Sequence, residues 1–282
     1  MTEMRIATTA DLAWIEPAAL QAHIIDAPGD LVAVLEADPW RVRVSGRGEA
    51  ALLDRWREHT NECAILGLWS APRRVPPLVA DIEALAAEMG FDRLIAPLVP
   101  EEAARPYLNA GLHVVERVAI MRRELRGWRP PPERDRSLSG VAVRLASEAD
   151  IERLVALDAI CFDDFWRYDG RILARLARIG RILVAEEEGL LIGYTLATAY
   201  GVDGSLGRLA VQPRARRRGV GRLLAEEAMV WLASLDVRSV VLSTQEHNDP
   251  SQSLYRSLGF VEVPGRLLAC ASGPLAGPGE EC

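Results

Sequence analysis

Hydrophobic positions in the second half of the chain follow two different periods. Apolar residues recur every three or four positions over residues 151–162 and 223–235, which predicts two amphipathic helices. Residues 182–185 and 190–200 are nearly continuous apolar runs on either side of Glu-Glu-Glu-Gly at 186–189, a pattern typical of a strand hairpin. Strands and helices are therefore expected to alternate.

The same reasoning extends this pattern to the end of the second half. Short apolar runs predict strands over residues 206–211, over 239–245 and from 260 onward. A helix is expected over 250–258, because Pro250 can occupy its first turn. The second half is therefore interpreted as one α/β unit.

The first half repeats motifs of the second half, and internal repeats indicate duplicated structural units. Residues 4–12 match residues 143–151, and in both a Thr or Ser with Asp three positions later can cap a helix. Residues 107–112 and 255–260 both place a glycine four positions after a tyrosine, where it can end a helix. We therefore interpret the chain as two copies of one α/β unit.

A proline-rich segment separates the two copies. Residues 128–140 combine prolines, charges and serines, a composition typical of a linker. The predicted domains are residues 1–127 and 141–270. Residues 271–282 are rich in glycine, proline and glutamate, and we expect this tail to be flexible.

The sequence Arg-Arg-Arg-Gly-Val-Gly at 216–221 stands between a predicted strand and a predicted helix. A helix N-terminus offers backbone amides and partial positive charge to an anion, and glycines let the backbone approach a phosphate closely. The alternative is that this basic run is a solvated face. The corresponding segment of the first half, 70–77, has three prolines and no glycine, so we expect that half to lack an amide cradle.

Composition narrows the classes of protein to consider. The net charge of -7 argues against general nucleic-acid binding, so the arginines form a local feature. The four cysteines, Cys63, Cys161, Cys270 and Cys282, are widely spaced, which argues against a metal site and favours free thiols in the cytoplasm. The longest uncharged stretch, 189–202, is too short to span a membrane.

The order of these motifs resembles the GNAT superfamily of acyl-CoA-dependent N-acetyltransferases. The resemblance rests on the loop pattern Q/R-x-x-G-x-G/A at 216–221, on the strand 209–211, and on Leu-Tyr-x-x-x-Gly-Phe at 254–260, with Asn248 seven residues before Tyr255. It covers the second half nearly end to end. It implies two tandem GNAT-like domains, each a mixed, mostly antiparallel twisted sheet flanked by helices, the first degenerate.

The resemblance also implies a binding site for acetyl-CoA, in which amides of 217–221 would hold the pyrophosphate and strand 209–211 would pair with the pantetheine arm. Asn248 would bind the arm's amide, and Tyr255 would protonate the leaving thiolate. The cofactor residues implied are Leu209, Ala210, Val211, Arg216, Arg217, Arg218, Gly219, Val220, Gly221, Arg222, Asn248 and Tyr255. Alternatively, Tyr255 is a core residue and Asn248 a turn or cap residue.

Direct attack on the thioester needs a neutral amine and hence a proton acceptor. Ribosomal-protein alanine acetyltransferases place a glutamate twelve residues before the tyrosine, where this chain has Ser243. Other carboxylates could then serve as the catalytic base: Glu246, which lies beside His247 at the end of the same strand, or Asp163 and Asp164. Acidic and aromatic residues suit a cationic amine, and the acceptor-pocket candidates are Asp163, Asp164, Trp166 and Tyr194. Alternatively, Asp163 and Asp164 are exposed loop residues and Tyr194 is a core residue.

These expectations combine into one functional hypothesis. The chain would be a cytoplasmic acetyl-CoA-dependent N-acetyltransferase that acts by direct transfer on a primary amine of a small molecule or a peptide. It would need no metal, nucleic acid or membrane, and would be a monomer of two pseudo-dimeric domains or a homodimer. The alternative is a non-catalytic acyl-CoA sensor or interaction protein, suggested by the missing strand glutamate and the degenerate first half.

Overall fold

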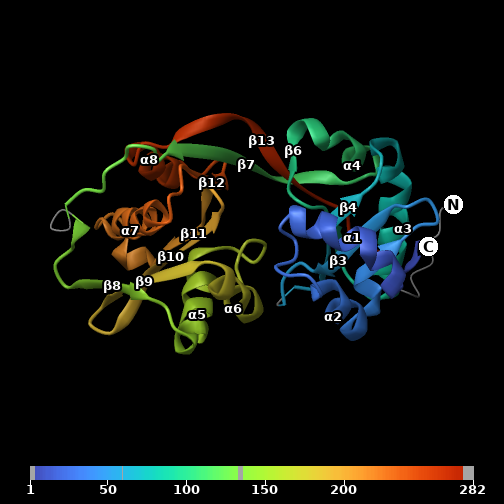
Figure 1. Cartoon of the computed structure of the whole chain (residues 1–282), viewed down its shortest axis with the longest axis horizontal. Helices are drawn as coiled ribbons and strands as arrows, with labels where there is room; N and C mark the ends of the chain where they lie inside the picture. Colours follow the sequence, from blue (N-terminus) through green and yellow to red (C-terminus); the bar gives the residue numbers. More distant parts are fainter. Residues whose placement is uncertain (1–3, 59, 133–135, 276–282) are drawn as a thin grey trace. The chain divides into compact units, whose positions relative to one another are not determined.

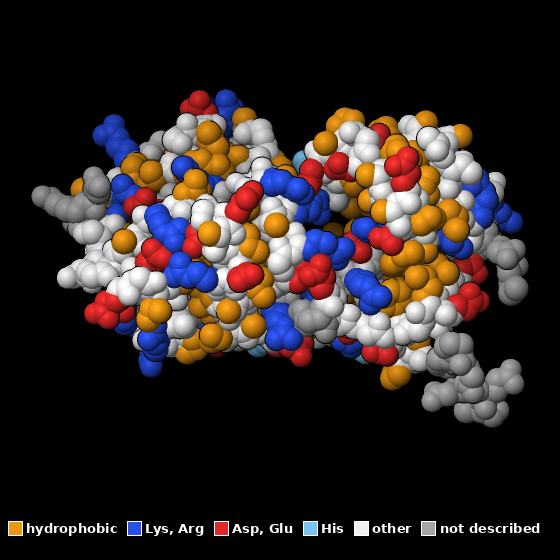
Figure 2. Space-filling model, turned by 90° about the horizontal axis from the view of Figure 1, so that it is seen from below, with side chains coloured by type: hydrophobic (Ala, Val, Ile, Leu, Met, Phe, Trp, Pro, Cys, Tyr) orange, Lys and Arg blue, Asp and Glu red, His pale blue; other side chains and the backbone are white. Residues whose placement is uncertain are grey.

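The computed structural model describes residues 4–58, 60–132 and 136–275. The chain forms two compact units, Met1–Arg117 with Arg266–Cys282, and Val118–Gly265. Within the described residues, no helix is long and apolar enough to cross a membrane. On the face shown in Figure 2, acidic and basic side chains are interspersed rather than gathered by sign.

The first unit consists of one sheet and its helices (Figure 1). Its sheet has the order β1-β2-β3-β4-β5-β13, with β6 also paired to β13. Neighbouring strands are antiparallel except β4 and β5, which are parallel. Its elements are β1 (Arg5–Ile6), α1 (Thr9–Gln21), α2 (Asp30–Ala37), β2 (Val42–Val44), β3 (Ala50–Arg55), β4 (Glu62–Trp69), α3 (Val75–Glu88), β5 (Arg93–Ile95), β6 (Val99–Pro100), α4 (Arg105–Asn109) and β7 (His113–Glu124), whose end enters the second unit.

The second unit has a sheet of the same design. Its strand order is β8-β9-β10-β11-β12-β7, antiparallel except for the parallel pair β11 and β12. The helices and strands predicted for the second half are present, with boundaries that differ by a few residues. Its elements are β8 (Val141–Leu145), α5 (Ile151–Cys161), α6 (Gly170–Ile179), β9 (Arg181–Glu187), β10 (Leu190–Tyr200), β11 (Asp203–Val211), α7 (Val220–Ser234), β12 (Ser239–Gln245), α8 (Asp249–Ser257) and β13 (Val261–Ala271), whose end belongs to the first unit.

Each unit completes its sheet with a strand from the other half of the sequence. Residues 118–124 of β7 pair with β12 in the second unit. The end of β13 pairs with β5 and β6 in the first unit, through Ala271 with Ile95 and Leu267 with Pro100. The compact units therefore differ from the predicted ranges 1–127 and 141–270, because strand pairing is decided by contacts far apart in sequence.

The predicted tail and linker are partly bound to the fold. The hydroxyl of Ser272 accepts a hydrogen bond from the Leu94 amide at 2.9 Å, so the tail segment next to β13 is fixed, while residues 276–282 lie outside the described residues. In the linker, the Arg136 guanidinium pairs with Glu227 of α7. The guanidinium of Arg123 stacks on Trp128 at 5.2 Å.

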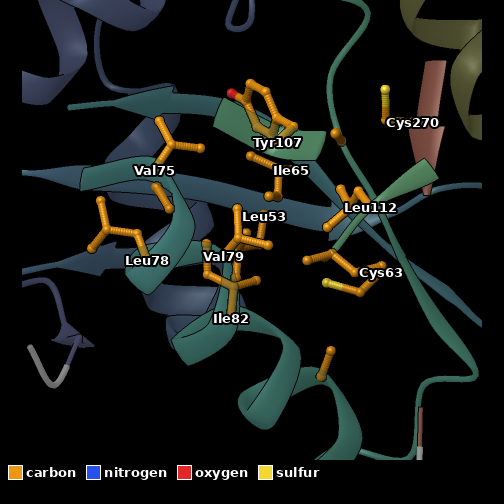
Figure 3. Packing of buried hydrophobic residues seen from close by; sticks show 14 of the residues in the cluster. Leu53, Cys63, Ile65, Val75, Leu78, Val79, Ile82, Tyr107, Leu112 and Cys270 are labelled. Carbon is orange, nitrogen blue, oxygen red and sulfur yellow. The ribbon is translucent and has the colours of Figure 1, made fainter. Parts of the chain in front are cut away.

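Helical spacing of apolar residues explains how the helices cover the sheets. In the first unit, α3 buries Leu78, Val79 and Ile82 against strand residues that include Leu53 and Ile65 (Figure 3). In the second unit, α7 covers one sheet face, with Leu224, Ala225, Ala228, Met229 and Leu232 fully buried. The helices α5 and α6 pack on β9 and β10 through a separate core cluster. Each leucine buried in this way contributes about 2 kcal/mol.

The duplication predicted from sequence is visible in detail. The helix caps Thr8 and Ser147 both form capping boxes, in which Asp11 and Asp150 accept hydrogen bonds from the cap residues. Both sheets also carry a β-bulge on the strand before the main helix. Leu66 in β4 and Gly207 in β11 are the extra residues, as the pairing registers show. The two units are therefore copies of one design, down to local irregularities.

Candidate functional site

The strands β11 and β12 separate at one end of the second unit's sheet. They pair only over Asp203–Ser205 and Ser239–Val241, whereas β12 continues to pair with β7 as far as Gln245. Residues 206–211 of β11 therefore have an edge that β12 does not cover. A free backbone edge of this kind can pair with an extended ligand.

The loop after β11 contains two residues with positive φ. A 3₁₀ turn at Pro213–Ala215 leads to Arg217 (φ 58°) and Gly219 (φ 90°), the residue that precedes the first turn of α7. Glycine adopts such angles without steric cost. A side-chain carbon on Gly221 would lie 3.3 Å from Leu254 Cδ2 of α8, so this glycine permits the close approach of α7 to α8.

The N-terminus of α7 presents unpaired backbone amides. The first helical hydrogen bond runs from the Leu223 amide to the Gly219 carbonyl at 3.0 Å. Within the described part of the chain, the amides of residues 217–222 have no acceptor. Their N–H dipoles and the helix dipole together favour an anion at this end of α7. The geometry is that of the amide cradle expected from the sequence.

The corresponding helix end in the first unit is built differently. Pro76 and Pro77 lie in the first turn of α3, and neither has an N–H to donate. The preceding Arg74 pairs with Glu49 at 2.8 Å, and this pairing lowers the pKa of the Glu49 carboxyl. Among the described residues, the first copy therefore keeps the strand and the helix but has prolines where an amide cradle would need donors.

Two of the loop arginines extend into solvent. Arg217 is exposed and has no partner among the described residues. Arg218 is also exposed and forms an ion pair with Glu187, with Nη1 at 3.1 Å from Oε2. This pair lowers the pKa of the Glu187 carboxyl. Because surface ion pairs are weak, both guanidiniums remain available to an approaching polyanion.

The other two arginines are held against the protein. Arg216 Nε donates to the Val211 carbonyl at 3.0 Å, so its side chain folds back along the end of β11. Arg222 Nη2 donates to Ser257 Oγ of α8 at 2.6 Å, and its Nη1 lies 3.2 Å from Glu226 Oε1. These contacts link the first turn of α7 to α8 beside the amide cradle.

Tyr255 lies on the buried side of α8, with 6% of its surface exposed. Its ring meets Phe260 edge-on, with 5.8 Å between centroids, and burial raises the pKa of the hydroxyl to about 12. No described residue is hydrogen-bonded to that hydroxyl. The side chain thus packs in the core, as the alternative interpretation held, and also retains an unused, fully protonated hydroxyl.

Asn248 and Glu246 lie at the opening of the separated strands. Asn248 caps α8, because its Oδ1 accepts from the Ser251 amide at 3.2 Å, so the cap interpretation is confirmed. Its contact with a cofactor remains a prediction. Glu246 is an exposed residue whose carbonyl accepts from Gln252 at 2.8 Å. Ser243, three residues earlier and within β12, is also exposed.

The predicted acceptor residues occupy three different environments. Asp163 is exposed and accepts from the Trp166 amide at 3.1 Å. The Asp164 side chain is 77% exposed and pairs with Arg167 at 2.8 Å. Trp166 is half-buried. Tyr194 differs most from expectation, because it is fully buried.

A buried ion pair that was not predicted from the sequence lies on the sheet face that α5 covers, where Tyr194 also lies. Asp158 of α5 is 0% exposed and Arg208 of β11 is 8% exposed. Arg208 donates to both carboxylate oxygens, at 2.9 and 2.6 Å. The Tyr194 hydroxyl also donates to Asp158, so it is not available to line an acceptor pocket. A charged residue inside the apolar run 206–211 was the available signal, since buried charges need partners.

The second half of the chain is similar in sequence to known acetyltransferases. Residues 149–260 match the model of the acetyltransferase (GNAT) family. The mycothiol acetyltransferase of Thermobispora bispora is 31% identical over 174 residues, which are 56% of this chain and 58% of that protein. The chain therefore spans less than two thirds of that relative. The uncharacterized N-acetyltransferase YhfO of Bacillus subtilis is 32% identical over 99 residues, 33% of this chain and 66% of that protein.

Solved structures show the same fold over the whole chain. A tandem GNAT protein from the clavulanic acid biosynthesis pathway has a TM-score of 0.68 at 20% identity, covering 99% of both chains. A GCN5-related N-acetyltransferase from Sphaerobacter thermophilus has a TM-score of 0.62 at 18% identity, covering 99% of this chain and 97% of that one. The predicted fold, tandem mixed sheets flanked by helices, is confirmed. Residues 149–260 thus match the GNAT family, and the whole chain has the fold of tandem GNAT proteins.

Proposed function

We propose that this chain transfers an acetyl group from acetyl-CoA to a primary amine. The GNAT family uses acetyl-CoA as co-substrate and acts on amine acceptors. The observation that carries the proposal is the end of α7, where the amides of residues 217–222 have no acceptor among the described residues and lie beside the uncovered edge of β11. A pyrophosphate and an extended amide-bearing arm are the ligands that suit such a pair of features.

The residues present fit acetyl-CoA in shape and charge. The amides of residues 217–222 would hold the pyrophosphate, and Arg217 and Arg218 would add charge-assisted hydrogen bonds from solvent. Leu209, Ala210 and Val211 would offer their backbone to the pantetheine arm, and the Asn248 side-chain amide would contact it. Gly221 lets the first turn of α7 pack against α8, since any side chain there would press on Leu254.

The proposed reaction is a direct transfer. The neutral amine attacks the thioester carbonyl carbon, a C–N bond forms, and the C–S bond breaks as the electron pair leaves on sulfur. The Tyr255 hydroxyl gives its proton to the departing thiolate and is reprotonated from solvent. Glu246, directly or through water, takes the proton that the amine nitrogen releases. With a pKa of about 12, Tyr255 remains protonated at any physiological pH.

Titration calorimetry with acetyl-CoA tests the first step. We expect binding by the wild type and at least a tenfold weaker affinity in Gly221→Asp, which adds a side chain and a negative charge to the cradle. Pro76→Asp is the matched control, because Pro76 holds the corresponding position in α3 and its change should leave the affinity unaltered. Arg217→Glu, at an exposed position with no partner in the described part of the chain, checks the charge effect without a packing change.

A non-catalytic acyl-CoA-binding role is the second candidate. It is favoured by Ser243, which puts a hydroxyl where related enzymes of the ribosomal-alanine class have a carboxylate. Release of CoA in the presence of a panel of amines separates the two functions. Amine-dependent release that falls in Tyr255→Phe supports the enzyme, and tight binding without release supports the sensor.

A further inference from the structure

The buried pair of Asp158 and Arg208 leaves part of the arginine unused. The Asp158 carboxylate accepts one hydrogen bond from Nε and one from Nη2. A guanidinium has five N–H donors in a fixed plane, so three remain, two on Nη1 and one on Nη2. Besides Asp158, the Tyr194 hydroxyl is the one hydrogen-bonding neighbour of Arg208 among the described residues, and Arg208 keeps 8% of its surface exposed. One edge of the guanidinium is thus an unfilled donor fork.

Aromatic rings fix the orientation of this fork. The Arg208 guanidinium carbon lies 3.4 Å from the centroid of the Phe162 ring and 4.0 Å from that of Tyr168. The Tyr168 amide also donates to Asp158, at 2.6 Å. Because two rings lie against the guanidinium and a buried carboxylate binds one of its edges, the Arg208 side chain has little rotational freedom. A donor fork held in this way is preorganised for a single oxygen-bearing group.

The fork is placed beside the proposed site of transfer. Arg208 directly precedes Leu209, where the backbone edge of β11 is uncovered by β12. Successive side chains of a strand point to opposite faces, and Leu209 packs with the α7 cluster, whereas Ala210 packs with the α5 and α6 cluster. Arg208 therefore lies on the α5 face, together with the segment 162–168, which holds the acceptor candidates Asp163, Asp164 and Trp166.

We propose that Arg208 selects acceptors whose amine is accompanied by a carbonyl or carboxylate oxygen, as in α-amino acids and peptide N-termini. The inference rests on the proposed function and names its acceptor class. Asp158 already balances the charge of Arg208, so a neutral carbonyl oxygen suffices as the partner. The free donors of Nη1 and Nη2 would bind that oxygen while the amine faces the thioester.

Two matched acceptor pairs test this specificity. Phenylalaninamide and 2-phenylethylamine differ only by a carboxamide, as do alaninamide and ethylamine. We would measure kcat/KM for all four with the wild type and with Arg208→Lys, whose ammonium retains the charge beside Asp158 but lacks the planar fork. All measurements share one pH, so differences in amine pKa cancel when the two proteins are compared.

We expect Arg208→Lys to lose at least tenfold in kcat/KM for the carboxamide acceptors and less than threefold for the alkyl amines. Tyr194→Phe removes a hydroxyl that bonds Asp158 and Arg208 but keeps the guanidinium itself, and should keep the wild-type preference. The inference would be overturned if Arg208→Lys lowered kcat/KM equally for both acceptor types, or left the ratio of carboxamide to alkyl-amine kcat/KM unchanged. The pair of Asp158 and Arg208 would then have a structural role only. Wild-type protein that binds acetyl-CoA but acetylates no amine would reject the proposed function itself.

Discussion

Removing the carboxylate of Asp158 should be among the most destabilising single changes in the second unit. Asp158 accepts hydrogen bonds from Arg208, from the Tyr194 hydroxyl and from the Tyr168 amide. Asp158→Ala would leave a guanidinium that is more than nine-tenths buried without its counter-charge. Breaking one partner of such a pair costs about 3–5 kcal/mol, a large share of a total stability of about 5–15 kcal/mol.

A double-mutant cycle distinguishes the cost of the orphaned charge from lost packing. Arg208→Met removes the other charge while keeping an unbranched side chain between the Phe162 and Tyr168 rings. The double variant Asp158→Ala, Arg208→Met should be more stable than Asp158→Ala alone by about 2 kcal/mol, because no buried charge remains. Glu152→Ala, an exposed carboxylate on the same helix, should change stability by less than about 0.5 kcal/mol.

Urea unfolding followed by tryptophan fluorescence and circular dichroism supplies the free energies. Coincidence of the two signals is needed before a two-state value is assigned to a chain of two units. A loss below about 1 kcal/mol in Asp158→Ala, or a double variant less stable than either single one, would refute the reasoning about charge burial.

Three further outcomes are expected. Tyr255→Phe should lower kcat by about 10²-fold or more with little change in the Kd for acetyl-CoA, and an unchanged kcat would remove Tyr255 from the mechanism. The wild-type rate should show no loss from ionisation of this tyrosine until the pH nears its pKa of about 12. Gly221→Asp should weaken acetyl-CoA binding at least tenfold and Pro76→Asp should not, and equal effects would disprove the asymmetry between the two helix ends. Arg144 and the Ser147 cap hold the pKa of Asp150 well below its usual range. The stability that Asp150 adds is therefore present above the unfolded pKa near 4 and is lost as the pH falls through the lower folded value. Asp150→Asn should lose about 2 kcal/mol of unfolding free energy at pH 7 and much less near pH 2, and a difference in urea midpoint that stays constant with pH would contradict this.

Local patterns predicted the parts of the site that depend on neighbouring residues. The loop at 216–221 and the start of α7 could be predicted because glycine spacing and helix periodicity are properties of one short segment. The absence of a cradle in the first half followed equally directly from Pro76 and Pro77, which lack the N–H groups that a cradle requires.

Contacts between distant residues were missed for a physical reason. Asp158 and Arg208 are 50 residues apart, and neither carries a motif that identifies the other. Tyr194 looked like a pocket residue because its polar group was visible in the sequence, but its hydrogen-bond partner was not. The destinations of β7 and β13 are likewise set by pairing with strands far along the chain, which hydrophobic periodicity does not encode.

The exchange of β7 and β13 determines when each unit can fold during synthesis. The first unit needs Ala271 to extend its sheet beyond Ile95, so its sheet stays incomplete until residue 271 has been made. At about 5–20 residues per second, that delay after β5 is on the order of 10–35 s. The second unit's strand β7 is made early and must wait for β12. A nascent chain of this protein therefore exposes unpaired strand edges on the ribosome, and a fragment that bears the site must begin upstream of Val118 to supply all six strands of its sheet.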